Sequence, residues 1–145
     1  MAADGESDAL HRHPVVRSSF DPSAPAFFSW LAVVPYLEPP AIDATFRFIA
    51  SLPAATAVVF DYAVPPESLS WTSRLIFNQM AKRVAAVGEP WKTFFDPATL
   101  LAHLRHLGFS SAEDFGADVL NRRYFSGRKD KLKIGGMGHM AMARV

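Results

Sequence analysis

The sequence predicts an α/β fold with a layered, at least partly parallel sheet. Two short apolar stretches, FFSWLAVV (27–34) and TAVVFDY (56–62), are rich in aromatic and β-branched residues and lie close to prolines. Buried strands lack the alternation of half-exposed ones, so both stretches are typical of strands covered on two faces. Helix-forming segments follow each of them, and such alternation favours a layered α/β architecture.

The segment AIDATFRFIASL (41–52) predicts a helix between these two strands. It follows Pro39 and Pro40, and proline is tolerated in the first turn of a helix, where its missing N–H has no partner to lose. Pro53 ends the segment, because the residue before a proline disfavours helical geometry. One apolar face repeats at four and three residues, and it consists of Ile42, Phe46 and Ile49.

Two more helices are expected after the second strand. The first runs from Glu67 to about Val87, and one side of it carries Leu69, Ile76, Met80, Val84 and Val87. The second opens at Asp96-Pro97, with the aspartate as N-cap and the proline at the first helical position. Its stripe comprises Leu100, Leu101, Leu104 and Leu107. Gly108 suits the left-handed position after the last turn, and Phe109 is placed to close a contact beneath it.

The carboxyl-terminal part predicts a strand at 111–115, a short helix at 117–125 and a final strand at 139–145. Gly135, Gly136 and Gly138 precede that last strand. A dinucleotide-binding loop follows a strand and opens a helix, so this context favours a turn instead.

Composition excludes several classes of function. The 145 residues contain no cysteine, which excludes disulfides, Cys-ligated zinc and thiol catalysis. The net charge of +1 gives no overall field for nucleic acid or an anionic membrane, so we expect neither as a partner. The amino terminus lacks the apolar core of a signal peptide, and a cytoplasmic location is expected. Residues 1–18 are predicted to be a flexible leader and residues 19–145 the folded domain.

Two local clusters leave alternatives. Between Arg122 and Lys133 there are six cations and one anion, Asp130. A phosphate or nucleic-acid patch is one interpretation, and a solvated loop around Gly127 is the one we favour. His103 and His106 are one helical turn apart but have no evident third ligand, so we expect a surface pair and no metal site. His139 could be buried or could act as a base on the substrate side, and the sequence does not decide.

The informative polar and aromatic residues stand at the ends of the first two strands. Ligands of open α/β sheets bind at the carboxyl ends of strands. The first strand leads through Ser29, Trp30 and Leu31 to Tyr36, and the second ends in Asp61-Tyr62. An apolar wall with aromatic faces and one carboxylate suits a small organic ligand. A purely structural role in the core is equally compatible with Trp30 and Tyr36.

Three stretches carry a resemblance to a known family: FDPSAPAFFSWLAVVPYL (20–37), ATFRFIASLPAATAVVFDYA (44–63) and RVAAVGEPWKTFFDPATLLAHLRHLGFSSAEDFGADVLNRRYF (83–125). Together they resemble the carboxyl-terminal half of class I S-adenosylmethionine-dependent methyltransferases, most closely the leucine carboxyl methyltransferase-like group. The resemblance covers residues 18–145 in order. It implies a partial Rossmann-like methyltransferase sheet, with this chain supplying the fourth to seventh strands and their flanking helices.

The resemblance also implies roles for the strand-end residues. Ser29, Trp30 and Leu31 would lie near S-adenosylmethionine, and Tyr36, Asp61 and Tyr62 near a small-molecule methyl acceptor. The family's glycine-rich cofactor loop and ribose-binding acid have no counterpart here. Leu31 also stands where relatives carry an acidic residue, and Ala32 where they carry glycine. No catalytic residue can be named from this comparison.

Two functions from different classes follow as hypotheses. The first is S-adenosylmethionine-dependent O-methyl transfer to a small-molecule or carboxyl acceptor, with this chain inactive unless the other half of the fold is provided. A shortened reading frame is a variant of that hypothesis. The second is a non-catalytic interaction module, in which the exposed edge of strand 27–34 pairs with another copy or a partner.

Overall fold

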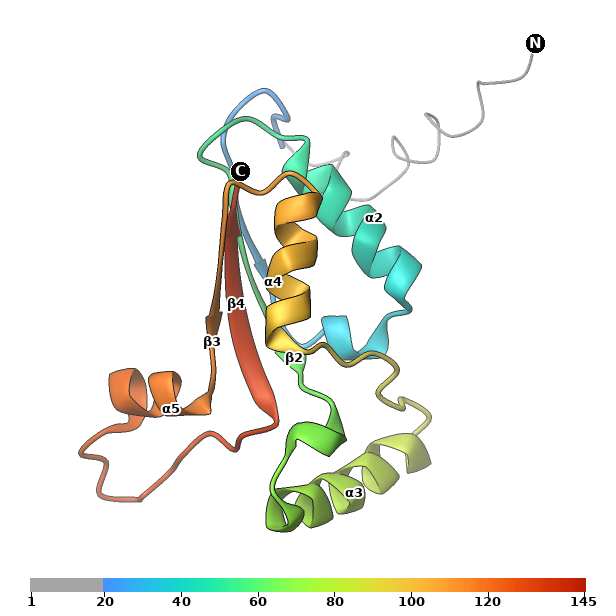
Figure 1. Ribbon diagram of the computed structural model, residues 1–145, viewed down its shortest axis with the longest axis vertical. Helices are drawn as coiled ribbons and strands as arrows, with labels where there is room; N and C mark the ends of the chain where they lie inside the picture. Colours follow the sequence, from blue (N-terminus) through green and yellow to red (C-terminus); the bar gives the residue numbers. More distant parts are fainter. Residues whose placement is uncertain (1–19) are drawn as a thin grey trace.

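The computed structural model describes residues 20–145, and its strands form one open sheet with the order β1-β2-β4-β3 (Figure 1). The strands are β1 (Phe27–Trp30), β2 (Ala57–Ala63), β3 (Ser111–Phe115) and β4 (Gly138–Arg144). β1 and β2 are parallel, while β4 is antiparallel to both of its neighbours. The predicted α/β class with a partly parallel sheet is confirmed. The predicted leader, 1–18, lies outside the described residues.

Helix α2 (Pro39–Ala50) connects the parallel strands β1 and β2. It begins at the proline pair, as the sequence predicts, and all three residues of its predicted apolar face are buried: Ile42, Phe46 and Ile49 are 0–2% exposed. The helix therefore forms because its apolar stripe packs on the sheet.

Strand β1 is shorter than predicted, and the expected span 27–34 is wrong in its second half. The strand ends at Trp30, and a short 3₁₀ helix, η2 (Val34–Tyr36), follows. Between them Ala32 adopts a left-handed backbone with φ of 57°. The carboxylate of Asp61 accepts a hydrogen bond of 2.6 Å from the N–H of Ala32, which turns the chain away from the sheet.

The second crossover contains η3 (Pro66–Ser68), α3 (Trp71–Ala86) and α4 (Pro97–His106). Helix α4 has the predicted cap, since Oδ1 of Asp96 accepts a 3.0 Å hydrogen bond from the N–H of Thr99. At its other end Gly108 has φ of +112°, a left-handed geometry that glycine adopts without a steric penalty. Phe109 is buried beneath it, as expected.

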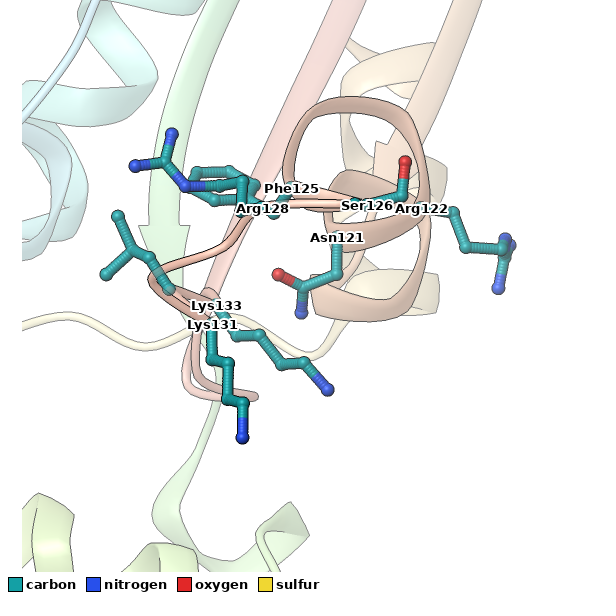
Figure 2. Close-up of a pocket in the computed structure, with 9 residues that line it drawn as sticks. Asn121, Arg122, Phe125, Ser126, Arg128, Lys131 and Lys133 are labelled. Carbon is teal, nitrogen blue, oxygen red and sulfur yellow. The ribbon is translucent and has the colours of Figure 1, made fainter.

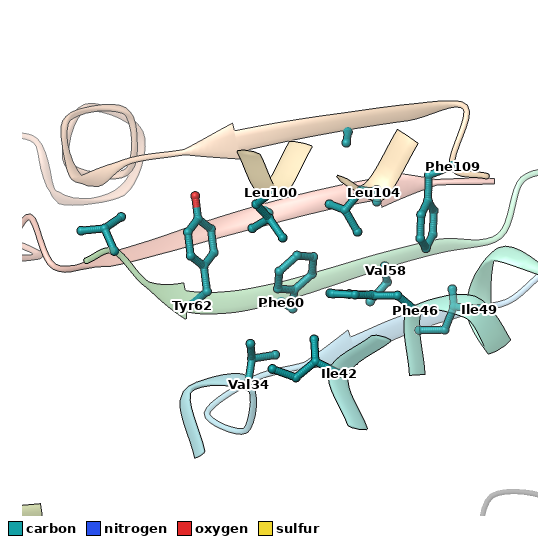
Figure 3. Close-up of a cluster of buried hydrophobic side chains, with 14 of the residues drawn as sticks. Val34, Ile42, Phe46, Ile49, Val58, Phe60, Tyr62, Leu100, Leu104 and Phe109 are labelled. Carbon is teal, nitrogen blue, oxygen red and sulfur yellow. The ribbon is translucent and has the colours of Figure 1, made fainter. Parts of the chain in front are cut away.

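The hydrophobic core lies on one face of the sheet, where α2 and α4 pack (Figures 1 and 3). Phe46 of α2 and Phe60 of β2 stand at its centre, with ring centroids 4.9 Å apart. Leu100 and Leu104 of α4 cover the same face and are fully buried. Among residues on the opposite face, Phe27 is 64% exposed, and Val59 and Met142 are half-buried.

Helix α3 leaves most of its apolar side chains in solvent. Of the expected side, Ile76, Met80 and Val87 are 62%, 43% and 74% exposed. The buried residue of α3 is Phe77, which packs against Trp91 and Phe94. Figure 1 shows why: α3 lies beyond the end of the sheet, so the sheet does not cover the side of this helix that was expected to be buried.

The predicted strand at 111–115 is β3. The predicted short helix at 117–125 consists of α5 (Ala117–Leu120) and a π-helical turn, η4 (Asn121–Phe125). The glycine-rich segment is a turn that leads into β4 and opens no helix. None of the helices in residues 20–145 is long and apolar enough to cross a membrane.

Candidate functional site at the carboxyl edge of the sheet

Three strands end at one edge of the sheet. β3 is antiparallel to β4, as β2 is, so β1, β2 and β3 all run in one direction. Their carboxyl ends therefore meet, and β4 begins at the same edge, with Tyr62 paired to His139. Open α/β sheets bind ligands at this edge.

A hydrogen-bonded cluster of three side chains occupies this edge: Tyr62, Asp114 and His139. The Tyr62 hydroxyl donates to Oδ1 of Asp114 at 2.5 Å. Nδ1 of His139 lies 3.0 Å and 3.1 Å from the two oxygens of the same carboxylate. The rings of Tyr62 and His139 are 5.6 Å apart between centroids. Each member comes from a different strand, so the cluster ties β2, β3 and β4 together.

Burial controls the ionisation of Tyr62. The side chain is 2% exposed, and loss of water raises the pKa of its hydroxyl well above the usual range for tyrosine. The hydrogen bond to Asp114 and the negative charges of Asp114 and Asp96 raise that pKa further. Tyr62 is therefore a hydrogen-bond donor and not a base at neutral pH.

The same cluster orients His139. A carboxylate only accepts hydrogen bonds, so Nδ1 must carry the proton that faces Asp114, and in a neutral ring the lone pair is then on Nε2. Every buried side-chain nitrogen and oxygen in residues 20–145 has a hydrogen-bond partner. Nε2 makes no hydrogen bond among these residues, and the side chain of His139 is 17% exposed. Gly116 leaves room for the ring, since a Cβ there would lie 3.0 Å from Cε1 of His139.

The three residues predicted near a cofactor lie in β1 and just beyond it. Ser29 is exposed on the sheet face that α2 and α4 leave open, and Leu31 is 48% exposed just after the strand. Trp30 points to the other face and packs edge-on against Phe46, with centroids 5.5 Å apart. The sequence left open whether Trp30 lines a ligand site or packs in the core, and in the structure it packs against the core.

The three residues predicted near an acceptor divide between two places. Tyr36 lines a pocket of about 480 Å³ between two segments of the chain. The other lining residues are Ala32, Val33, Leu37, Gly88, Glu89, Pro90 and Lys92. Asp61 holds one wall of this pocket through its hydrogen bond to Ala32. Tyr62 instead faces Asp114 in the cluster described above.

Sequence reasoning missed Asp114 and gave His139 no defined partner. These two residues and Tyr62 come from three separate segments, and no local motif links them. Only the strand order and register bring them together. His103 and His106 lie at or near the surface of α4: Nε2 of His103 lies 2.8 Å from Oδ1 of Asp43, and His106 is exposed. Within residues 20–145 no group of three potential ligands could hold a metal ion.

A family model described as leucine carboxyl methyltransferase matches residues 1–50. A methyltransferase described as SAM-dependent, from Archaeoglobus fulgidus, superposes with a TM-score of 0.55 over 86% of this chain at 14% identity. This chain has a methyltransferase fold. A methyltransferase candidate from Thermobifida fusca gives a TM-score of 0.58 over 99% of this chain at 20% identity. The resemblance seen in the sequence is confirmed at the level of fold.

The chain spans only part of the length of the solved structures that it matches. A DUF574 family protein from Streptomyces avermitilis, 15% identical with a TM-score of 0.57, matches 99% of this chain. The chain spans 53% of that protein's length, 52% of the Thermobifida protein's and 61% of the Archaeoglobus protein's. No curated protein matches the chain significantly.

Proposed function

We propose that this chain is the acceptor-side half of an S-adenosylmethionine-dependent methyltransferase acting on an oxygen of a small molecule. One observation carries the proposal: the sheet order β1-β2-β4-β3, with β4 antiparallel. This matches the fourth to seventh strands that the family resemblance implies. The family-model match at residues 1–50 supports methyl transfer as the class of reaction.

The residues around β1 fit one side of the cofactor. Ser29 and Leu31 present an exposed hydroxyl and an exposed apolar surface near the carboxyl end of the strand. The N–H of Ala32 is already used by Asp61, and residues 29–31 carry no charge for the amino-acid end of the cofactor. We therefore propose that the remaining contacts come from the part of the methyltransferase fold that lies outside the described residues.

His139 is the residue best placed to take a proton from the acceptor. When bound, the cofactor would supply the methyl group as an electrophile. An acceptor hydroxyl must lose its proton to become a good nucleophile, and Nε2 of His139 is open to receive it. Asp114 would stabilise the imidazolium that results, as carboxylates do beside catalytic histidines. A carboxyl acceptor is already ionised at neutral pH, so this base favours a hydroxyl acceptor.

Two protein forms test the proposal. The chain alone should bind S-adenosylmethionine weakly or not at all in a calorimetric titration, because it offers one side of the site. A form extended by the in-frame coding sequence upstream of Met1, if it carries a glycine-rich loop, should bind at micromolar concentration and transfer a labelled methyl group. A folded extended form that neither binds the cofactor nor transfers the label overturns the proposal. Micromolar binding of S-adenosylmethionine by the chain alone would overturn only the proposal that part of the cofactor site lies outside the described residues.

The role of His139 has its own test in an active form. His139→Gln should lower kcat, while His106→Gln, at an exposed position on α4, should leave it unchanged. An unchanged kcat in His139→Gln would show that His139 is not the base.

Within residues 20–145 no strand pairs with the outer edge of β1, and this edge supports a second candidate function, an interaction module. Strand β1 is at one end of the sheet order, and Phe27 on it is 64% exposed. An unpaired edge with apolar side chains is a template for another strand. In the first candidate function the first strand of the methyltransferase sheet would cover this edge, and in the second a strand of another copy would cover it. Sedimentation distinguishes the candidates: a stable monomer counts against self-association, and a dimer that is lost in Phe27→Lys supports it.

A further inference from the structure

Residues 121–134 form a closed loop beside the start of β4. The side-chain amide of Asn121 clips its ends together: Nδ2 donates to the carbonyl of Ile134 at 3.0 Å, and the N–H of Ile134 donates to Oδ1 at 2.8 Å. We call this segment the basic loop, because it contains six of the chain's 15 lysines and arginines. Closed surface loops of this length frequently carry function.

The basic loop encloses a pocket of about 440 Å³ (Figure 2). Phe125 and Leu132 give it an apolar surface, and Arg122, Arg128, Lys131 and Lys133 surround them. Figure 2 shows the side chains of Lys131 and Lys133 extending in the same direction from neighbouring points of the loop. The lining of the pocket therefore combines an apolar surface with arginine and lysine residues.

The single anion of the loop does not neutralise those two lysines. Nε and Nη2 of Arg128 donate to the two oxygens of Asp130 at 2.9 Å and 2.5 Å, and the N–H of Leu132 donates to Oδ1 at 3.2 Å. The bond from Arg128 holds the pKa of Asp130 below its usual range. Within residues 20–145, no carboxylate lies within ion-pair distance of Lys131 or Lys133.

The backbone of the loop is strained at the first of these lysines. Lys131 has φ of 55°, a left-handed geometry that is uncommon for a residue with a side chain. The hydrogen bonds of Asp130 to its neighbours hold the turn in place. Strained residues cluster at ligand sites, because surrounding contacts maintain a geometry that the residue alone disfavours.

We propose that the basic loop binds a small organic phosphate monoester, with the phosphoryl group on Lys131 and Lys133 and the organic part against Phe125 and Leu132. Lysine ammonium groups are strong ligands for phosphate oxygens. The pocket is of the size that small ligands occupy. Nucleic acid is the weaker alternative, because the net charge of +1 provides no extended field along a polymer. This proposal revives the phosphate-patch interpretation, although the sequence alone favoured a solvated loop for this segment.

The site is separate from the proposed methyl transfer, because neither lysine belongs to the cofactor or acceptor residues. Calorimetric titration with phenyl phosphate tests it in the chain as it exists. We expect saturable binding that is at least about tenfold tighter than that of inorganic phosphate, since only the ester reaches the apolar wall, and that weakens as salt is added.

Paired charge-removing variants locate the site. Lys131→Gln/Lys133→Gln should weaken phenyl phosphate binding by about tenfold or more, whereas Lys82→Gln/Arg83→Gln on α3 should leave it unchanged. Circular dichroism confirms that both variants fold. Equal affinity of the wild type and the loop variant overturns the site. Tighter binding of a single-stranded oligonucleotide than of phenyl phosphate, lost in the loop variant, overturns the choice of ligand.

Discussion

The Tyr62 hydroxyl donates a 2.5 Å hydrogen bond to the carboxylate of Asp114, and this bond joins β2 to β3 across the intervening strand β4. The two residues are 52 positions apart in the chain. The bond fixes the carboxylate that in turn faces His139. The geometry of the proposed base therefore depends on a residue that never needs to touch a substrate.

We expect Tyr62→Phe to lower the free energy of unfolding by about 1.5–3 kcal/mol, because it removes a buried hydrogen bond to a charged group. Asp114→Asn should destabilise as well. In a double-mutant cycle measured by urea denaturation, the two changes should be non-additive, because Tyr62→Phe removes the donor of the bond whose charged acceptor Asp114→Asn makes neutral. Tyr36→Phe, at a half-buried residue with no side-chain hydrogen bond among residues 20–145, is the control and should cost less than about 0.5 kcal/mol. Additive losses would show that the bond does not form in solution.

Tyr62 should also make stability depend on alkaline pH. Its pKa is raised in the folded protein, so the folded state keeps the proton after the unfolded chain has lost it at about pH 10. Stability from this group is then complete below about pH 10 and falls as the pH rises further. Urea denaturation between about pH 8 and pH 11 should give a steeper loss for the wild type than for Tyr62→Phe. Parallel pH profiles would contradict the burial of this hydroxyl in a neutral form.

The sequence predicts those parts of the fold that depend on local signals. The proline pair and the stripe of Ile42, Phe46 and Ile49 define α2, and the Asp96 cap and Gly108 define α4. Each of these signals acts within a few residues, so tertiary contacts need only reinforce it.

Features that depend on distant residues were not predictable in the same way. Strand β1 stops at Trp30 because Asp61, 29 residues away from Ala32, binds the backbone there. The apolar residues on the predicted side of α3 recur at helical spacing, but the helix lies beyond the sheet and this side is exposed. At the site, Asp114 could not be recognised before the order of β2, β4 and β3 was known.

The left-handed backbone at Ala32 predicts a stabilising glycine substitution. Ala32 has φ of 57°, which disfavours a residue with a Cβ, so Ala32→Gly should relieve strain of about 1 kcal/mol or more. The extra freedom of glycine in the unfolded chain offsets part of this, and we expect a net gain of about 0.5 kcal/mol. Ala44→Gly, at an exposed position inside α2, should instead cost about 1 kcal/mol. In both thermal and urea denaturation, the two variants should change the free energy of unfolding in opposite directions. A loss of stability in Ala32→Gly comparable to that in Ala44→Gly would contradict this backbone geometry.

The contrast between α2 and α3 yields the last prediction. Phe46 is fully buried and its ring packs against Trp30, Phe60 and Phe109, so Phe46→Ala removes apolar contact and leaves a cavity that the rigid sheet cannot fill. We expect a loss of about 3–5 kcal/mol in the free energy of unfolding. Ile76→Ala on α3 truncates a side chain that is 62% exposed and should change stability by less than about 0.5 kcal/mol. Both values come from urea denaturation of the isolated chain. A cost above about 1 kcal/mol at Ile76 would mean that α3 is covered in solution, and repeating the measurement over a range of protein concentrations would then show whether a second copy covers it.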